Sequence, residues 1–432
     1  MSTVRKVVLT AGFVCGMLAG VSAEDVAVLT TGTRVVGKVT SYDARNVAIE
    51  VKVGTRTLTR RYPLSRLKSL TVNGADIDLK TGRPADGSSA ASTPVRTERS
   101  EREILDEIER VGRTPPEWFD ETPLDYPQSL DLSWPQKPPG GWDNSKNVGQ
   151  YIWDRINTNP GKWREGVRLM HHILSVTKDA GVRERAMLAL GAMYHNLHQD
   201  YARAAFWYHQ MEVDRNPDNR PHAGMNLAHC YWQLGSKGLS LKLLARMKTK
   251  PYGTIKLLGD LGEPDAALSM AERFAKTGQA TTCYLYAGDV CRVAGQLEKA
   301  EDYYRRSITA IPPAEAEKPH QQRNKARAEA SIAAIRFYTL DPTKVKDGTY
   351  KSSSIGYEAQ VNIEVLVQGG RIEDVRVVSH REKQFYTSIT DTPRRILEKQ
   401  SVQGIDTTSG ATITSEAIIN ATAKALASGL QE

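Results

Sequence analysis

Small and aromatic residues recur at helical spacing between residues 148 and 340, and this recurrence limits the possible folds more than any other feature of the chain. Small residues at fixed places let paired helices approach, and aromatic rings fill the gaps, so we expect nearly all of these positions to lie in the core. The clearest copy of the pattern runs from Tyr284 to Pro312. Its marker residues are Ala287, Gly288, Cys291, Ala300, Tyr304, Ser307 and Pro312.

Related units precede this copy. They are Leu190 to Pro217 with one residue inserted, a weaker copy from Ala228 to Leu244, and a degenerate unit at 262–267. The spacing resembles that of tetratricopeptide repeats (TPRs) and predicts an all-α, TPR-like solenoid over residues 148–340. Such arrays present a concave groove, usually to a peptide or a partner protein. Four histidines of this region, His171, His172, His195 and His198, lack the spacing to Cys or carboxylate residues that a metal site needs.

The first 23 residues have the pattern of a secretory signal peptide. Arg5 and Lys6 precede an apolar run, and Val21-Ser22-Ala23 forms a small-residue cleavage site before Glu24. The sequence therefore predicts an exported protein, periplasmic or otherwise extracytoplasmic, soluble or peripheral. No later apolar stretch reaches the ~18 residues that a membrane span needs. The formal charge of +8 indicates a solvated basic surface, and export argues against nucleic acid as a partner.

Two segments are expected between the signal peptide and the helical region. Residues 24–75 carry β-favouring apolar residues separated by turn residues, which predicts a small, SH3-like β-barrel. Residues 76–147 are predicted to be a linker that contains a short helix from Glu101 to Val111 and a Pro- and Trp-rich segment. Neither segment contains a residue pattern that indicates catalysis or cofactor binding.

Three cysteines remain after removal of the signal peptide: Cys230, Cys283 and Cys291. An odd count argues against a disulfide framework. If Cys283 and Cys291 lie on one straight helix, they are about 12 Å apart, too far for a disulfide bond. All three cysteines are therefore predicted to be small core residues.

The stretch from Asp406 to Ser415 reads DTTSGATITS and precedes a predicted helix that ends at Gly429. Thr414 or Ser415 is the expected N-cap of this helix. Gly410 allows a tight turn, and the free N–H groups at the helix start, together with the helix dipole, favour an anion. A phosphate group would bind well at this place.

The small residues Ser409, Gly410 and Ala411 leave the hydroxyl of Thr412 unshielded. Asp406 lies about one turn earlier, where a carboxylate would help to position a metal or to deprotonate that hydroxyl while it is modified. This arrangement suits a threonine that becomes esterified.

Asp-x-x-Ser-Gly-Ala-Thr followed by Thr-Ser resembles the motif in the FMN-binding domain of the C subunit of sodium-pumping NADH:quinone oxidoreductase and of the G subunit of the Rnf complex. In that family, FMN is joined through its phosphate to the last threonine of the motif, which is Thr412 here. The resemblance implies covalent threonyl FMN, with an FAD:protein FMN transferase as the modifying partner. The remaining residues that it assigns to the cofactor site are Asp406, Ser409, Gly410, Ala411 and Thr414.

The resemblance covers residues 341–432 and implies an α+β domain. A hairpin from Val361 to Val378 is predicted to turn at Gly369-Gly370, and a second helix to begin with Thr392 as N-cap and Pro393 as its first residue. Many family members carry a Gly-rich stretch after the hairpin, whereas residues 380–386 of this chain read HREKQFY. Four aromatic residues are candidates either for contact with the flavin ring or for the core: Tyr350, Tyr357, Phe385 and Tyr386.

These features leave three functions open. The favoured one is an exported flavoprotein electron carrier with FMN on Thr412, which docks to redox partner proteins through the TPR-like region and the β domain. The second is an envelope scaffold or sensor whose C-terminal domain is structural or binds flavin reversibly, as the missing Gly-rich stretch suggests. The third is an enzyme that reduces a small substrate at the flavin, which requires an open pocket beside the ring. The sequence shows no nucleophile–base pair or metal centre that would indicate a self-contained enzyme.

Overall fold

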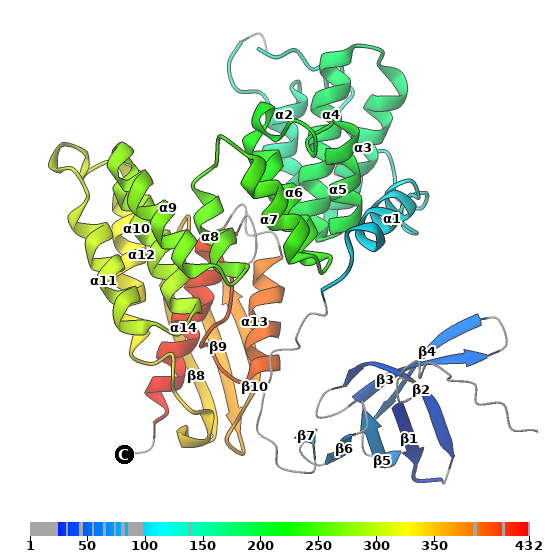
Figure 1. The fold of residues 1–432 in the computed structure, drawn as a ribbon, viewed down its shortest axis with the longest axis vertical. Coiled ribbons are helices and arrows are strands. Elements are labelled where there is room, and N and C mark those ends of the chain that lie inside the picture. Colours follow the sequence, from blue (N-terminus) through cyan, green and yellow to red (C-terminus); the bar gives the residue numbers. More distant parts are fainter. Residues whose placement is uncertain are drawn as a thin grey trace, which may run out of the picture. The chain divides into compact units, whose positions relative to one another are not determined.

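The computed structural model describes residues 25–31, 33–42, 46–53, 56–63, 66–72, 75–78, 83–84, 98–137, 140–382, 387–407 and 411–430. The predicted signal peptide lies outside the described residues. The chain forms two compact units, Met1–Pro94 and Val95–Glu432, and each is described by itself (Figure 1).

The first unit is an antiparallel β-sheet with the strand order β4-β3-β2-β1-β5-β6-β7. Its strands are β1 (Asp25–Leu29), β2 (Arg34–Tyr42), β3 (Asn46–Val53), β4 (Arg56–Pro63), β5 (Leu67–Val72), β6 (Ala75–Asp78) and β7 (Arg83–Pro84). The sheet agrees with the β structure expected here, while closure into an SH3-like barrel stays a prediction. Strands β6 and β7 lie within residues expected to be linker, where Ile77 pairs with the buried Leu70.

The second unit begins with a helical region. Its helices are α1 (Glu101–Gly112), α2 (Val148–Tyr151), α3 (Trp163–Val176), α4 (Ala180–Met193), α5 (Tyr201–Gln210), α6 (Pro221–Gln233), α7 (Lys237–Arg246), α8 (Gly253–Asp260), α9 (Pro264–Phe274), α10 (Ala280–Val293), α11 (Leu297–Thr309) and α12 (Pro319–Ile335). Shorter helical turns join them: η2 (Ile152–Ile156), η3 (Pro160–Lys162), η4 (Tyr194–His198), η5 (Pro217–Asn219), η6 (Ala275–Gln279), η7 (Pro313–Glu315) and η8 (Pro342–Lys344).

Consecutive helices of this region pack closely at the small residues that the repeat pattern singles out. A Cβ atom on Gly191 would lie 2.6 Å from the Tyr208 ring, and one on Gly288 would lie 2.4 Å from the Tyr304 ring. The predicted packing role of these residues is therefore confirmed, while the assignment to the TPR class stays a prediction. The three cysteines predicted to be core residues are buried and free.

The chain ends in an α+β domain, as expected. Its strands β8 (Gly348–Ile355), β9 (Gln360–Gln368) and β10 (Arg371–Ser379) form an antiparallel sheet in the order β10-β9-β8. Alternate residues of β9 are fully buried: Val361, Ile363, Val365 and Val367. Helix α13 (Ser388–Lys399) packs on β10, and helix α14 (Thr412–Ser428) packs on β8 and β9 (Figure 1).

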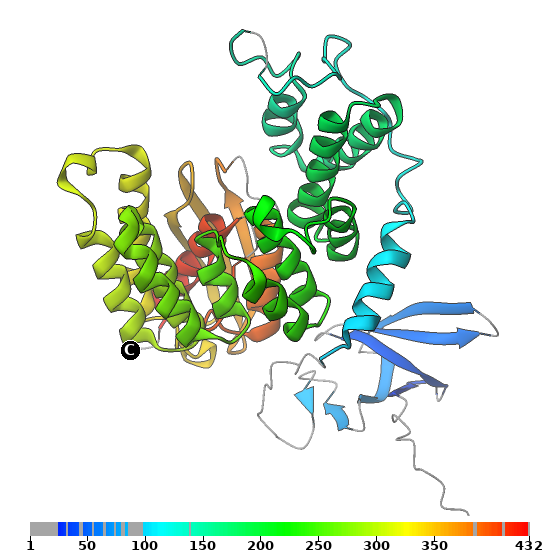
Figure 2. The same ribbon diagram turned by 45° about the horizontal axis from the view of Figure 1, so that its top comes forward.

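Helix α14 joins the two parts of the second unit. One side contacts the sheet and another contacts α12, so most of its residues are buried (Figures 1 and 2). The Glu416 carboxylate accepts two-pronged hydrogen bonds from the Arg327 guanidinium of α12, with an ion-pair distance of 2.8 Å. Tyr338 donates a hydrogen bond to the Asn420 side chain. The helical region and the C-terminal domain therefore share one buried interface.

Two predicted helix starts are wrong. Helix α13 begins at Ser388, because the Thr387 carbonyl already accepts hydrogen bonds from the N–H groups of Thr390 and Asp391. Pro393 thus lies inside the helix, where it removes one hydrogen bond. Helix α14 begins at Thr412, and among the described residues no side chain caps it.

Candidate functional site

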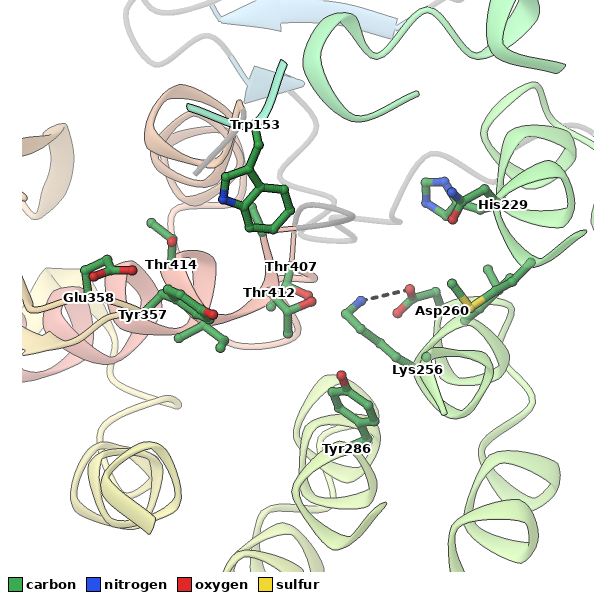
Figure 3. A pocket seen from close by; sticks show the side chains of 16 residues that line it. Trp153, His229, Lys256, Asp260, Tyr286, Tyr357, Glu358, Thr407, Thr412 and Thr414 are labelled. Atoms are coloured by element: carbon green, nitrogen blue, oxygen red, sulfur yellow. Dashed lines mark hydrogen bonds and ion pairs between the residues drawn. The ribbon is translucent and has the colours of Figure 1, made fainter. Parts of the chain in front are cut away.

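A cavity of about 450 Å³ lies between the C-terminal domain and the helical region (Figure 3). Its volume is in the range usual for small-molecule and cofactor sites. The C-terminal domain contributes Tyr357, Glu358, Thr407, Ala411, Thr412, Ile413 and Thr414. The helical region contributes Trp153 from η2, Met225, Asn226 and His229 from α6, Gly253, Lys256, Leu257 and Asp260 from α8, and Tyr286 from α10.

Thr412 is the first residue of α14, and its side chain is half-buried at the cavity wall. The N–H groups of the first helical turn have no partners within the helix, and the helix dipole is positive at this end. An anion bound to or esterified on Thr412 would therefore lie where the backbone stabilises negative charge. Ala411 is buried beside it, and within the described residues no side chain caps this end of the helix.

Glu382 organises the wall on the C-terminal side. Its buried carboxylate accepts hydrogen bonds from the backbone N–H groups of Tyr357 at 2.9 Å and Glu358 at 3.0 Å, and from the Thr414 hydroxyl at 2.5 Å. Gly356 is required beside it, because a Cβ atom there would lie 2.6 Å from a carboxylate oxygen. Glu382 thus fixes the β8–β9 turn against the first turn of α14. The Thr414 hydroxyl is engaged by this bond.

Lys256 connects the two walls. Its ammonium group lies 2.9 Å from the Asp260 carboxylate on the same helix and 2.5 Å from the Asp406 carboxylate of the C-terminal motif. The three side chains are only 10–25% exposed. Two carboxylates share one cation, so the cluster carries a net negative charge unless one of them is protonated. Figure 3 shows Lys256 between Asp260 and the threonines of the opposite wall.

The carboxyl groups of Asp260 and Asp406 have different surroundings, and their pKa values therefore differ. Burial acts to raise the pKa of Asp406, but the Lys256 charge and hydrogen bond outweigh it and hold the pKa at about 2. The backbone N–H of Thr407 also donates to Asp406, at 2.6 Å. Burial and the neighbouring Asp406 charge raise the pKa of Asp260 to about 7. Asp260 is therefore the group that holds the proton when the cluster is neutral.

A pair of neutral histidines lies behind Lys256. His229 lines the cavity, and its Nδ1 is 2.9 Å from Nε2 of the buried His195. Burial lowers the pKa of His195 to about 4, and burial followed by the His195 charge lowers the pKa of His229 well below its usual value. Both rings are therefore uncharged at neutral pH. Their ring nitrogens contact each other, Asn196 and Gln233, so the pair adds no positive charge to this side of the cavity and its hydrogen bonds are made within the protein.

Two large aromatic side chains at the cavity are substantially exposed. Trp153 is 52% exposed and Tyr357 is 45% exposed, although large rings usually bury most of their surface. The Arg323 guanidinium lies 3.9 Å from the centre of the Tyr357 ring and steadies it. Figure 3 shows Trp153 and Tyr357 on the same side of the cavity as Thr412. These rings offer flat apolar surface to a ligand.

The cavity also contains a buried hydroxyl group that the described residues leave without a partner. Thr407 is only 3% exposed, and its Oγ1 forms no hydrogen bond with any described residue. Buried polar groups are normally paired with protein, water or a ligand. This orphan hydroxyl, the exposed rings and the free helix start together fit a ligand with a flat ring and an anionic group.

Four of the residues assigned to the cofactor lie at this site: Thr412, Asp406, Ala411 and Thr414. Ser409 and Gly410 lie outside the described residues, as do Phe385 and Tyr386. Tyr357 reaches the cavity, but Tyr350 does not, because its ring packs on Gly429 at the other end of α14. That end is roughly 25 Å from Thr412, since each helical residue rises about 1.5 Å.

Sequence reasoning missed the contribution of the helical region. Trp153, Lys256, Asp260 and His229 come from separate helices, and no spacing in the sequence connects them with the motif. It also missed Glu382, which lies within the stretch that departs from the family pattern. The described residues contain no cluster of three metal-binding side chains. Within the same part of the chain, every helix is too short or too polar to cross a bilayer.

Comparisons with known proteins agree with this geometry. Residues 356–427 match the family described as the FMN-binding domain, and this segment holds strands β9 and β10, the motif and most of α14. The match supports FMN as the cofactor of the C-terminal domain. An uncharacterized protein from Treponema pallidum (strain Nichols) is 39% identical over 110 residues. The alignment covers 25% of this chain and 30% of that protein, and no solved structure matches.

Proposed function

We propose that this protein is an extracytoplasmic flavoprotein electron carrier in which FMN is attached by a phosphoester to Thr412. The observation that carries the proposal is the position of the Thr412 hydroxyl, on the first residue of α14 and at the wall of the cavity, within a segment that matches the FMN-binding domain. The resemblance to flavinylated subunits of sodium-pumping NADH:quinone oxidoreductase and Rnf supports the covalent link. FMN supplies the capacity to accept and release one or two electrons.

The attachment is a transfer from FAD that an FAD:protein FMN transferase would catalyse. The bond that forms joins Thr412 Oγ to the FMN phosphorus, the pyrophosphate bond of FAD breaks, AMP leaves, and a base takes the hydroxyl proton. In the folded chain, Asp406 is held by Lys256 at 2.5 Å, so its carboxylate fixes the motif at the cavity rather than remaining free. The start of α14 then holds the attached phosphate.

Electron carriage fits the residues better than substrate turnover does. Lys256 is paired with Asp260 and Asp406, and the two histidines are neutral and hydrogen-bonded to each other, so among these groups Asp260 is the one that could exchange a proton with an added substrate. Redox partners would dock on outer faces of the helical region or on the β domain. The cavity-lining residues of α6, α8 and α10 face the C-terminal motif, so a peptide partner that bound this side of the helical region would have to share the cavity.

The decisive experiment is the intact mass of the mature protein after coexpression with an FAD:protein FMN transferase, followed by peptide mapping. We expect a mass increase of one FMN less one water, located on the peptide that contains Thr412. Thr412→Ala should abolish the increase, whereas Thr422→Ala, a control in the middle of α14, should retain it. An unmodified mass from cells that flavinylate another protein would favour the scaffold or sensor instead.

Export is tested in the same material. The N-terminal sequence of the mature protein should begin at Glu24, and flavin should be found in the extracytoplasmic fraction. A full-length chain in the cytoplasm would contradict the proposed location.

A further inference from the structure

The cavity beside Thr412 has two walls that lie far apart in the sequence. The C-terminal wall consists mainly of threonines, Ala411, Ile413 and the β8–β9 turn. The helical wall carries the larger and more varied side chains, including Trp153, Lys256 and Tyr286. A ligand tethered at Thr412 would therefore find most of its specific contacts in the helical region.

Buried contacts fix the two walls against each other. The Arg292 guanidinium of α10 donates a hydrogen bond to the Ile405 carbonyl at 2.8 Å, directly before the motif. Lys256 of α8 holds Asp406, and Arg327 of α12 holds Glu416 on α14. Helices α8, α10 and α12 thus bind the chain on either side of Thr412. The cavity is a fixed feature of this interface.

The aromatic side chains indicate what shape of ligand fits. Trp153 comes from η2 and Tyr357 from the β8–β9 turn, and both rings expose about half of their surface at the cavity. A flat ring that stacks on them would remove this apolar surface from water, and such aromatic pairs are stabilising beyond the area that they bury. A planar heteroaromatic ligand matches this surface.

The polar side chains at the cavity indicate which hydrogen-bonding groups the edge of such a ligand carries. Lys256 can donate to a carbonyl oxygen, and the Thr407 hydroxyl can donate or accept. The Asn226 amide already donates to the Tyr208 hydroxyl at 3.3 Å, which leaves its carbonyl oxygen as an acceptor. Isoalloxazine has this character, because one edge is a dimethylbenzene and the other carries two carbonyl groups and an N–H group.

We propose that the helical region forms the second half of the flavin site, so that the isoalloxazine ring of FMN on Thr412 lies in the cavity, stacks on Trp153 and Tyr357, and directs its pyrimidine edge toward Lys256. The proposal rests on the proposed function. It assigns to the inner face of α6, α8 and η2 a role in cofactor binding that is separate from the docking of a partner.

The first test uses riboflavin, which has the ring but lacks the phosphate, with the unmodified full-length protein. Riboflavin should bind and lose fluorescence, and Thr412→Ala should not alter its affinity greatly. Trp153→Ala should weaken binding by up to about tenfold, the effect of one lost aromatic contact. Trp142→Ala is the matched control, since Trp142 is 64% exposed and does not line the cavity.

The second test uses the flavinylated protein. Tryptophan quenches flavin emission by electron transfer at contact, so Trp153→Phe should raise the emission severalfold while it keeps the ring stacked, and Trp142→Phe should not. Intact mass separates the two proposals, because it reports FMN on Thr412 independently of where the ring lies. No binding of riboflavin, equal effects of the two tryptophan variants, or unchanged emission from a fully flavinylated Trp153→Phe protein would overturn the inference.

Discussion

Two charged clusters join the helical region to the C-terminal domain, and they differ in charge balance and in surroundings. Arg327 and Glu416 form one cation–anion pair with side chains only 6% and 5% exposed. Lys256 instead serves two carboxylates, Asp260 and Asp406, at the wall of the cavity. The first cluster also has a proton-binding group, Asp289, because burial and the Glu416 charge raise its pKa well above the usual value. The comparison teaches that the first cluster is a fully buried joint between domains, whereas the second has its proton-binding group at the cavity, where the flavin ring is proposed to lie.

The largest loss of stability is expected when the pair of Arg327 and Glu416 is broken. Glu416→Ala should lower the free energy of unfolding by about 3–5 kcal/mol, because it leaves the Arg327 charge buried without a partner. Urea unfolding followed by helical circular dichroism measures this loss. Replacing both residues with apolar ones of similar size, Arg327→Met with Glu416→Leu, should cost much less.

The control for this measurement is Glu301→Ala, which breaks an ion pair with Arg305 within α11. Both side chains there are well exposed, at 62% and 35%, so the loss should stay below about 1 kcal/mol. Equal losses for Glu416→Ala and Glu301→Ala would show that the buried pair does not hold the two domains together.

A smaller effect is expected at Glu382, which borders the cavity but belongs to neither cluster. Glu382→Ala leaves the N–H groups of Tyr357 and Glu358 without their acceptor and should cost about 1–3 kcal/mol. It should also release the β8–β9 turn, so riboflavin affinity should fall in parallel. Glu382→Gln retains an acceptor and should recover part of both losses. Unchanged riboflavin affinity in Glu382→Ala would mean that the turn does not position Tyr357 for the ring.

These sites show what a sequence can and cannot predict. The alternation in β9, the glycine turn after it and the close packing of Gly288 on Tyr304 follow local periodicity, and the sequence predicted each of them. The motif singled out Thr412, which lines the cavity, because its residues are contiguous, and the attachment of FMN there stays a prediction. Helix starts were harder, since the proline at position 393 suggested a first helical residue, while the hydrogen bonds of Thr387 begin α13 earlier.

The wall of the cavity that the helical region forms depends on packing between residues far apart in the sequence, so the sequence did not predict it. Lys256 and Asp406 are separated by 150 positions, and nothing in the residues around Lys256 distinguishes it from a solvated surface lysine. The packing of α12 on α14 and the hydrogen bond from Arg292 of α10 to the Ile405 carbonyl help to bring them together. The same packing directs the cavity-lining residues of α6, α8 and α10 toward Thr407 and Thr412.

The smallest expected effect is the pH dependence of folding stability that arises from the cluster of Lys256, Asp260 and Asp406. The pKa of Asp260 rises from the ordinary 3.8 to about 7 on folding, so between these values the folded chain binds more protons than the unfolded chain. Asp260 by itself therefore makes stability decrease as pH rises from about 4 through about 7, whereas His195 and His229, whose pKa values are lowered on folding, act in the opposite direction below about pH 6.5. The low pKa of Asp406, about 2, acts in the opposite direction but only below pH 4.

Asp260→Asn removes this titrating group and leaves Lys256 paired with Asp406, so the stability of the variant relative to the unsubstituted protein should rise between pH 5 and pH 8 and change only slightly at pH 5. Urea unfolding of both proteins across this pH range measures the difference, with Asp265→Asn on the exposed side of α9 as the control. A difference that stays constant with pH would assign the proton to another group. A difference that rises for Asp260→Asn and stays constant for Asp265→Asn would establish a carboxyl group at the cavity that titrates near neutral pH, where the flavin ring is proposed to lie.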